Sequence, residues 1–491
     1  MISEAFNLVF QPAVLLYIVL GVASGMCIGC LPGLTATMGV ALVLPLTFGM
    51  ESTRGILLLI GVYFGAIYGG SISAILLNTP GTPASAATAM DGYKMAQRGE
   101  AGRALGISTT SSFIGGIVSC VFLLLISPIL AKFALKFSSP EFFMLATFGL
   151  CIIASISGTS LAKGIICGCV GILLATIGID SITGTIRFTF NNMNLLSGIN
   201  YIPVMIGLFA MSQAFQSVEE MYEKSVVNAK IDHVFPKRED WPIIGKSGLV
   251  YGTMGTLVGC IPGAGADIAA FIAYGQAKNT SSHPEDFGTG IPEAIAAPEA
   301  ANNGVTGGAM IPMLTLGVPG DAVAAIMIGA LTIQGLQPGP LLFQNNGPLV
   351  YSIFIGCFIA NICMFILGMS SMRIFTKVLS IPKSVLVPII FLLCVVGSYA
   401  LNNNFFDVGV MLLFGIIGYF WQKVDISSSP AVLGLILGPM AESHFRRALL
   451  MSNGDYKTFL STGICWVFFV LIIISLAIPV LQKRNGAKMK K

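Results

Sequence analysis

The chain has 491 residues, of which 55% are hydrophobic and only 10% are charged, whereas an ordinary soluble domain carries about 25% charged residues. The net charge is +4, and the sequence offers no basic face of the kind that binds nucleic acid. Long stretches with almost no charge, such as residues 12–90 and 301–372, are typical of membrane spans. The composition therefore excludes an ordinary soluble protein and predicts one surrounded by membrane lipid.

Taken in chain order, the apolar segments predict an all-α polytopic membrane protein. A helical crossing needs about 20 apolar residues. Full or partial crossings are expected at residues 12–30, 34–49, 55–78, 105–131, 141–158, 162–179, 201–217, 247–275, 302–330, 346–370, 385–400, 407–421 and 461–481. Several of these segments are interrupted, so we expect about 11–13 transmembrane or re-entrant helices.

Two halves of the chain are similar to each other, on either side of one long polar linker. Residues 25–36 recur at 255–266, and residues 69–86 recur at 308–325 in a second register that is nine residues longer. In the first register the matched residues are Gly25, Gly29, Cys30, Pro32, Gly33 and Ala36 with Gly255, Gly259, Cys260, Pro262, Gly263 and Ala266. In the second register they are Gly69, Ile72, Leu77, Pro80, Gly81 and Ala86 with Gly308, Ile311, Leu316, Pro319, Gly320 and Ala325. Internal repeats of this kind are common in secondary transporters.

The repeats and the charges together predict the organisation of the chain. We expect a first membrane repeat at residues 1–216, a cytoplasmic linker at 217–246, a second membrane repeat at 247–482 and a basic cytoplasmic tail at 483–491.

The distribution of Lys and Arg predicts that the two repeats have inverted topology. Basic residues gather in loops 91–103 and 217–246, which we expect to be cytoplasmic, whereas residues 1–11 and 334–348 contain no Lys or Arg. Two equal, odd-numbered halves would place the C-terminus outside, against the five basic residues of its tail. An extra crossing in the longer second half would resolve this conflict.

Four Pro-Gly breaks interrupt the apolar segments, at residues 31–33, 78–83, 261–265 and 317–321. Proline removes a backbone donor and glycine permits unusual conformations, so such pairs end helices. At membrane depth irregular backbone is tolerated where it lines a cavity. Ordinary helix kinking is the alternative. The substrate-binding residues that we expect are Pro32, Gly33, Thr35, Ser71, Ser73, Asn78, Thr79, Pro80, Gly81, Thr82, Pro262, Gly263, Gly265, Pro319 and Gly320.

Two intramembrane acids follow the third and fourth breaks. Asp267 and Asp321 are costly at such a depth and are functional candidates by default, although Asp is also a favoured helix N-cap. We expect a coupling cation, sodium or a proton, to be bound by Asp267, Asp321, Thr315 and Asn302. An anionic substrate would be recognised by glycine N–H groups and helix N-termini. No other cofactor is expected.

At these motifs the sequence resembles the large permease subunit of the tripartite tricarboxylate transporter family, the TctA family. The resemblance rests on residues 29–34, 68–82, 90–93, 297–303 and 314–320. It implies a multi-pass protein of the bacterial inner membrane that imports a tricarboxylate or related organic acid with a cation gradient. It also implies two partners, a small membrane subunit (TctB-like) and a periplasmic solute-binding protein (TctC-like). The chain departs from the family pattern at Asp321 and at Thr82-Pro83.

Two other functional classes compete with a carrier. An ion or solute channel would also use backbone carbonyls. A membrane-embedded enzyme is disfavoured because His233, His283 and His444 all lie in polar segments. The polar segment 293–303, which contains Glu299, is open to two interpretations: a gate, or a capped entry into a helix.

Overall fold

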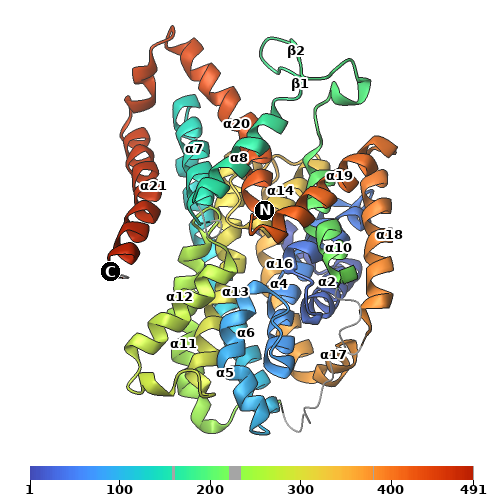
Figure 1. Cartoon of the computed structure of the whole chain (residues 1–491), viewed down its shortest axis with the longest axis vertical. Coiled ribbons are helices and arrows are strands. Elements are labelled where there is room, and N and C mark those ends of the chain that lie inside the picture. Colours follow the sequence, from blue (N-terminus) through green and yellow to red (C-terminus); the bar gives the residue numbers. More distant parts are fainter. Residues whose placement is uncertain (157–160, 220–233, 380, 490–491) are drawn as a thin grey trace.

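The computed structural model describes residues 1–156, 161–219, 234–379 and 381–489, and these are almost entirely helical (Figure 1). The first half contains α1 (Ile2–Val9), α2 (Pro12–Cys30), α3 (Ala36–Val43), α4 (Ser52–Leu77), α5 (Ala86–Gln97), α6 (Ala101–Ala134), α7 (Ser139–Ile156), α8 (Leu161–Ala175), α9 (Tyr201–Met205) and α10 (Ser212–Glu219). A π-helical segment, Ile206–Met211, joins α9 to α10. The antiparallel strands β1 (Gly178–Ile179) and β2 (Ile186–Arg187) form a short hairpin.

The second half is helical throughout its described residues. It contains α11 (Trp241–Gly259), α12 (Gly265–Thr280), α13 (Pro292–Leu316), α14 (Ala322–Ile333), α15 (Pro340–Asn345), α16 (Gly347–Ser370), α17 (Met372–Val378), α18 (Lys383–Asn402), α19 (Phe405–Lys423), α20 (Ser429–Met451) and α21 (Gly463–Met489). The expected crossings at 247–275 and 302–330 are each two helices, separated at the third and fourth Pro-Gly breaks.

Seven of the described helices are long and apolar enough to cross a membrane. They are α2, α4, α6, the continuous segment Tyr201–Glu219, α16, α18 and α19. Shorter apolar helices occur at α3, α7, α8, α14 and α21. The chain is therefore a multi-pass helical membrane protein with interrupted helices, as the sequence predicts.

Helix α4 lies at the centre of the protein and packs closely on α2. Its apolar window is completely buried. Glycine makes this approach possible, because a Cβ at Gly25 would lie 2.3 Å from the carbonyl oxygen of Val62, and one at Gly65 would lie 2.3 Å from that of Val22. Small residues spaced by four let membrane helices touch along their backbones.

Helices α11 and α13 of the second half repeat these contacts at the offsets found in the sequence. The close contact between Gly255 and Ala301 corresponds to the contact between Gly25 and Val62. In the same way, the contact between Gly304 and Gly252 corresponds to that between Gly65 and Val22. The pair α11–α13 is thus packed residue for residue like the pair α2–α4. This correspondence extends the sequence match into three dimensions, while the inverted orientation of the repeats stays a prediction.

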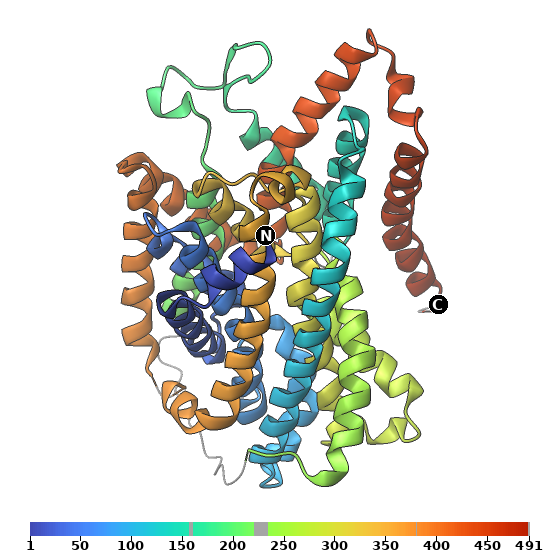
Figure 2. The ribbon, with the colours of Figure 1, turned by 180° about the vertical axis from the view of Figure 1, so that it is seen from behind.

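The two basic segments lie at the same end of the protein. Arg103, in the first turn of α6, donates two hydrogen bonds to Asp240 at 2.6 and 2.9 Å, and Lys237 pairs with Glu100 at 3.1 Å. The hairpin of β1 and β2 lies at the opposite end (Figures 1 and 2). Met1 packs at Gly347, which begins α16 at the end of the loop without Lys or Arg.

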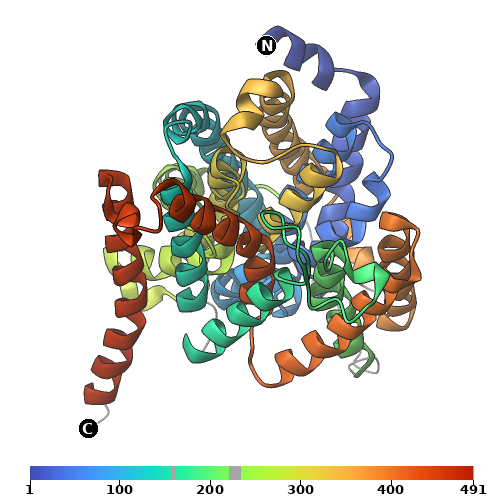
Figure 3. The same cartoon turned by 90° about the horizontal axis from the view of Figure 1, so that it is seen from above.

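A peripheral group of helices stands beside this central body. Helices α7, α8, α20 and α21 pack on one another, and Met144, Ala448, Phe459 and Cys465 form a small separate core among them. Seen from above, α21 runs along the outer edge, far from the N-terminus (Figure 3). The expected basic tail continues α21 as far as Met489, and residues 490–491 lie outside the described residues.

Candidate functional site

All four Pro-Gly breaks meet around one cavity of about 300 Å³. Most of the residues that line it lie at the end of a break or directly after it, and these residues correspond to one another at the two repeat offsets. The lining residues are Thr35, Ala36 and Thr37; Thr82, Pro83 and Ala84; Gly265, Ala266 and Asp267; Asp321, Ala322 and Val323; together with Ile67, Phe209, Ser427 and Ser429. The structure thus gathers four segments that are far apart in the sequence.

Each break ends one helix and begins another whose N-terminus borders the cavity. Helix α3 begins after Thr35, α12 begins at Gly265 and α14 begins after Asp321, while a short 3₁₀ turn, Pro83–Ser85, leads into α5. Free N–H groups and the helix dipole make such ends favourable for anions. Four of them at one cavity form an arrangement suited to a negatively charged ligand.

The backbone at the breaks needs glycine for two different reasons. Gly33 and Gly263 have positive φ angles of 89° and 79°, which other residues rarely adopt. Gly81 instead lies against other backbone, because a Cβ there would be 1.9 Å from the carbonyl oxygen of Gly29. A hydrogen bond of 2.7 Å from the Gly263 N–H to the carbonyl of Gly320 ties the third and fourth breaks together.

Asp321 is buried and bonded on both carboxylate oxygens. Its Oδ1 accepts the backbone N–H of Ala324 at 2.7 Å, which makes it the N-cap of α14, and its Oδ2 accepts the hydroxyl of Tyr63 at 2.6 Å. The capping interpretation therefore holds for Asp321. The sequence did not point to Tyr63, which lies within the continuous apolar run of α4.

Asp267 has a different environment from Asp321, although both line the cavity. It lies in the first turn of α12, after the N-cap residue Ala264, and its side chain is exposed. An exposed carboxylate in the wall of the cavity is available to a ligand. Among the described lining residues these two acids carry the only charges.

Several predicted site residues lie away from the cavity lining. Asn78 and Thr79 are exposed just after the end of α4, and Thr79 bonds to the carbonyl of Leu77. Ser73 and Thr315 are buried and bond to carbonyls of their own helices. The Pro and Gly residues of the breaks shape the backbone next to the lining without belonging to it: Pro32, Gly33, Pro80, Gly81, Pro262, Gly263, Pro319 and Gly320.

Two further predicted residues, Ser71 and Asn302, belong to a second buried polar region. Ser71 donates to the carboxylate of Glu299, and both side-chain polar atoms of Asn302 are buried without a hydrogen-bond partner. Glu299 lies two turns inside α13, which begins at Pro292. The segment 293–303 runs from the first turn of α13 into its interior, so Glu299 itself is not a capping residue, and a gating role for the segment stays a prediction.

Other lining residues escaped the sequence analysis because the repeats do not include them. Phe209 comes from the π-helical segment Ile206–Met211, a form often found at functional sites. Ser427 comes from the loop before α20, and Ser429 is the first residue of that helix. Their one signal is a run of three serines and a proline ahead of an apolar stretch.

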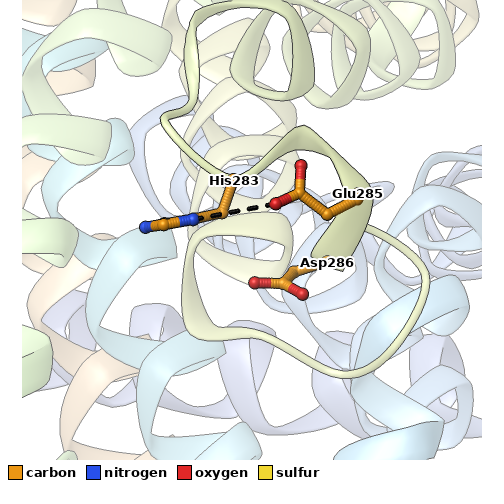
Figure 4. Close-up of side chains that lie close together, drawn as sticks. All are labelled: His283, Glu285 and Asp286. Carbon is orange, nitrogen blue, oxygen red and sulfur yellow. Dashed lines mark ion pairs between the residues drawn. The ribbon is translucent and has the colours of Figure 1, made fainter.

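Two other features lie apart from this cavity. A larger cavity of about 720 Å³, lined in part by Gln337, His444 and Arg447, contains none of the predicted site residues. His283, Glu285 and Asp286 form an exposed group between α12 and α13 (Figure 4), with Nδ1 of His283 lying 3.8 Å from Oε1 of Glu285. Exposed acidic groups of this kind are common without a metal, so we assign the group no function.

Comparison with known proteins identifies similar chains. The profile of the tripartite tricarboxylate transporter TctA family matches residues 15–433. An uncharacterized 52.8 kDa protein in the TAR-I ttuC' 3'region of Agrobacterium vitis is 36% identical over 489 residues, which are 99% of this chain and 97% of that protein. An uncharacterized protein in the TAR-II ttuC' 3'region of the same organism is 37% identical over 235 residues, 47% of this chain and 97% of that protein. No solved structure matches.

Proposed function

Because the chain belongs to the TctA family of tripartite tricarboxylate transporters, we propose that it imports a carboxylate, a tricarboxylate or related organic acid, driven by a cation gradient. It is the large subunit of a transporter and not an enzyme. The proposal places it in the bacterial inner membrane. There it works with a small membrane subunit and receives substrate from a periplasmic solute-binding protein.

The observation that carries the proposal is the convergence of four helix N-termini on the cavity. A carboxylate needs positive potential and hydrogen-bond donors, and no Lys, Arg or His is present among the described lining residues. Helix ends and hydroxyls such as those of Thr35 and Thr82 supply both needs without a fixed counter-charge. Discontinuous helices bind anionic substrates in the same way in other secondary transporters.

The two aspartates of the lining support cation coupling. A carboxylate substrate next to Asp267 and Asp321 would be repelled unless a cation came with it. Of the two, the exposed Asp267 is free to contact that cation, whereas Asp321 is engaged by Tyr63 and by its own helix. Sodium, held by carboxylate and hydroxyl oxygens, is the proposed partner ion.

Reconstitution tests this function directly. The large and small subunits are placed in proteoliposomes with the solute-binding protein outside, and uptake of labelled citrate, a dicarboxylate and an aromatic acid is followed under an imposed sodium gradient. We expect at least one acid to accumulate only when sodium and the binding protein are present. Counterflow of labelled substrate distinguishes a carrier from a channel, because a channel does not show it. Uptake of none of these acids would contradict the proposal.

Variants that fill the cavity connect this function to the site. Ala266→Leu places a large side chain in the cavity wall at the start of α12. Gly275→Leu adds a similar volume later in the same helix, where nothing lies within 4 Å of an added Cβ. We expect Ala266→Leu to abolish uptake and Gly275→Leu to retain it, at equal amounts of protein in the membrane. Equal uptake by both variants would exclude this cavity as the substrate site.

A further inference from the structure

Glu299 is the centre of a buried polar cluster built from four helices. It lies on α13 with none of its surface exposed. Its Oε1 accepts the hydroxyls of Ser71 on α4 and Thr88 on α5, each at 2.5 Å. Its Oε2 accepts the hydroxyls of Ser108 and Ser112 on α6, at 3.0 and 2.8 Å. We name these five residues the Glu299 cluster.

The carboxyl group of Glu299 has no basic partner among the described residues. Within the described part of the chain, no Lys, Arg or His forms an ion pair with Glu299. Asp91, three residues after Thr88 on α5, is occupied by the N–H groups of Gly288, Gly290 and Ile291. An uncompensated carboxylate in the membrane is costly, and where it occurs it commonly belongs to an ion pathway.

Amide oxygens with no partner lie one turn further along α13. Among the described residues, Oδ1 and Nδ2 of Asn302 have no hydrogen-bond partner and neither does Oδ1 of Asn303, although all three atoms are buried. The Nδ2 of Asn303 is bonded to the backbone carbonyl of Glu299. Buried polar groups are normally satisfied, and the two unpaired amide oxygens, one helical turn from Glu299, are of the kind that coordinates a cation.

We propose that the Glu299 cluster is a binding site for a single sodium ion. Carboxylate, hydroxyl and amide oxygens are the ligands of hard cations, and one negative charge among neutral oxygens suits a monovalent ion better than a divalent one. A bound proton, in contrast, would be shared between only two of these oxygens. The hydroxyls can release the carboxylate and turn their lone pairs to the ion, because each lies in or beside a helix where a preceding carbonyl can accept the freed O–H.

The position of the cluster explains how such an ion would influence the cavity. Thr82 lines the cavity, and the segment that follows it passes Glu299 at Thr88 before reaching the basic loop. Helix α4 likewise contributes Ile67 to the cavity and Ser71 to the cluster. An ion that draws Ser71 and Thr88 inward therefore changes the wall of the cavity. This role rests on the proposed cation coupling, whereas the binding of sodium does not.

The binding test needs no carboxylate substrate. The purified full-length protein in detergent is heated at increasing NaCl, with choline chloride keeping the ionic strength constant, and the midpoint of unfolding is recorded. Bound ligand raises this midpoint by mass action. The comparison uses Asp267→Asn as the background, because this substitution removes the proposed cation contact in the cavity and keeps the cluster intact. We expect sodium to raise the midpoint of this background, and we expect Glu299→Gln added to it to lose the response.

Single hydroxyl variants keep the test valid if Glu299→Gln does not fold. Ser112→Ala removes one proposed ligand, and we expect it to raise the half-saturating sodium concentration about tenfold or more. Ser111→Ala is the matched control, because Ser111 is the neighbouring buried serine on α6 and its hydroxyl has no partner. It should leave the sodium response unchanged.

Three outcomes would overturn the inference. The first is a sodium response that survives when Glu299→Gln is combined with Asp267→Asn, and the second is an equal half-saturating concentration in Ser112→Ala, Ser111→Ala and the wild type. The third is a wild type that responds to pH but not to sodium, with Glu299→Gln insensitive to both, because the cluster would then bind a proton. A wild type that takes up no carboxylate but still responds to sodium would contradict the proposed function without contradicting the sodium site.

Discussion

At the scale of single residues, similar acids in similar motifs have different roles. Asp321 and Asp267 each follow a Pro-Gly break, yet one is a bonded helix cap and the other is exposed in the cavity wall. Glu299 lies in a segment that is polar in sequence, yet its side chain is completely buried and accepts hydroxyl hydrogen bonds from three other helices. The function of each acid therefore depends on partners that are distant in sequence.

The first prediction concerns the two aspartates of the cavity. We expect Asp267→Asn to raise the sodium concentration needed for half-maximal uptake, because it removes the available carboxylate. Asp321→Asn should change this concentration little, since Asn also caps helices well. Asp321→Ala removes both the cap and the acceptor of the Tyr63 hydroxyl, so it should lower the free energy of unfolding by about 2–4 kcal/mol. Uptake assays in proteoliposomes and thermal unfolding measure these effects. Wild-type sodium dependence in Asp267→Asn would exclude that residue from coupling.

The second prediction concerns the hydroxyl of Tyr63. Tyr63→Phe removes the bond to Oδ2 of Asp321, so a buried carboxylate loses one of its donors. We expect a loss of about 1–3 kcal/mol in the free energy of unfolding. Tyr399→Phe, at an exposed tyrosine of α18, serves as the control. Equal stability of the two variants would show that the bond does not hold Asp321 in place.

At the scale of elements, glycines set the distances between helices and between the breaks. Helices α2 and α4 touch along their backbones, as do α11 and α13. The breaks are held by the same means, because Gly81 lies against Gly29 and a Cβ at Gly320 would lie 2.4 Å from the carbonyl oxygen of Gly259. The cavity therefore keeps its form only while these positions lack side chains.

A third prediction separates close packing from backbone conformation. Gly81→Ala and Gly320→Ala should abolish uptake and lower the unfolding temperature, because a methyl group would collide with backbone that cannot move easily. Gly99→Ala is the control: Gly99 has a φ of 83° but open space around it. This substitution should lower the free energy of unfolding by only about 1–2 kcal/mol. Comparable unfolding temperatures for the three variants would refute the packing argument.

At the scale of the whole molecule, charge distribution and fold agree on two distinct ends. The basic segment 91–103, which forms the end of α5 and the start of α6, meets the end of the linker through the bonds of Arg103 and Lys237. The opposite end carries the hairpin of β1 and β2, where Arg446 binds Asp180 and holds the pKa of that carboxyl well below its usual range. Phe190 is 85% exposed in the loop after this hairpin.

The fourth prediction tests this orientation in intact cells. In a protein without the exposed Cys169, Lys94→Cys and Lys237→Cys should resist a membrane-impermeant thiol reagent, because basic loops stay cytoplasmic. Phe190→Cys should react readily, since it is exposed at the other end. Permeabilised cells provide the control for accessibility. Labelling of both lysine positions in intact cells would reverse the assignment.

A fifth prediction concerns the hairpin end. Arg446→Gln should increase protease cleavage near residues 178–200, because it removes one of the two ion pairs that hold the hairpin on α20, the other being Arg187 with Glu442 at 2.6 Å. The wild type should show the same change on acidification. A carboxyl group with a lowered pKa stabilises the fold at neutral pH. This contribution is lost as the pH falls below the ordinary pKa of an aspartate toward the lowered pKa in the fold. Unchanged cleavage in Arg446→Gln would show that the ion pair does not anchor the hairpin.

The membrane location, the helical class, the four breaks and the paired offsets could all be predicted from the sequence. Hydropathy and the chemistry of Pro and Gly act locally, so they can be read along the chain. The packing of the helices was needed to see that the four breaks share one cavity and that Thr315, Ser73 and Asn78 lie away from it. It also decided that Ser71 turns to Glu299. These outcomes depend on which helices pack together and on the side of each helix that faces its neighbour, and both are set by contacts between residues that are distant in the chain.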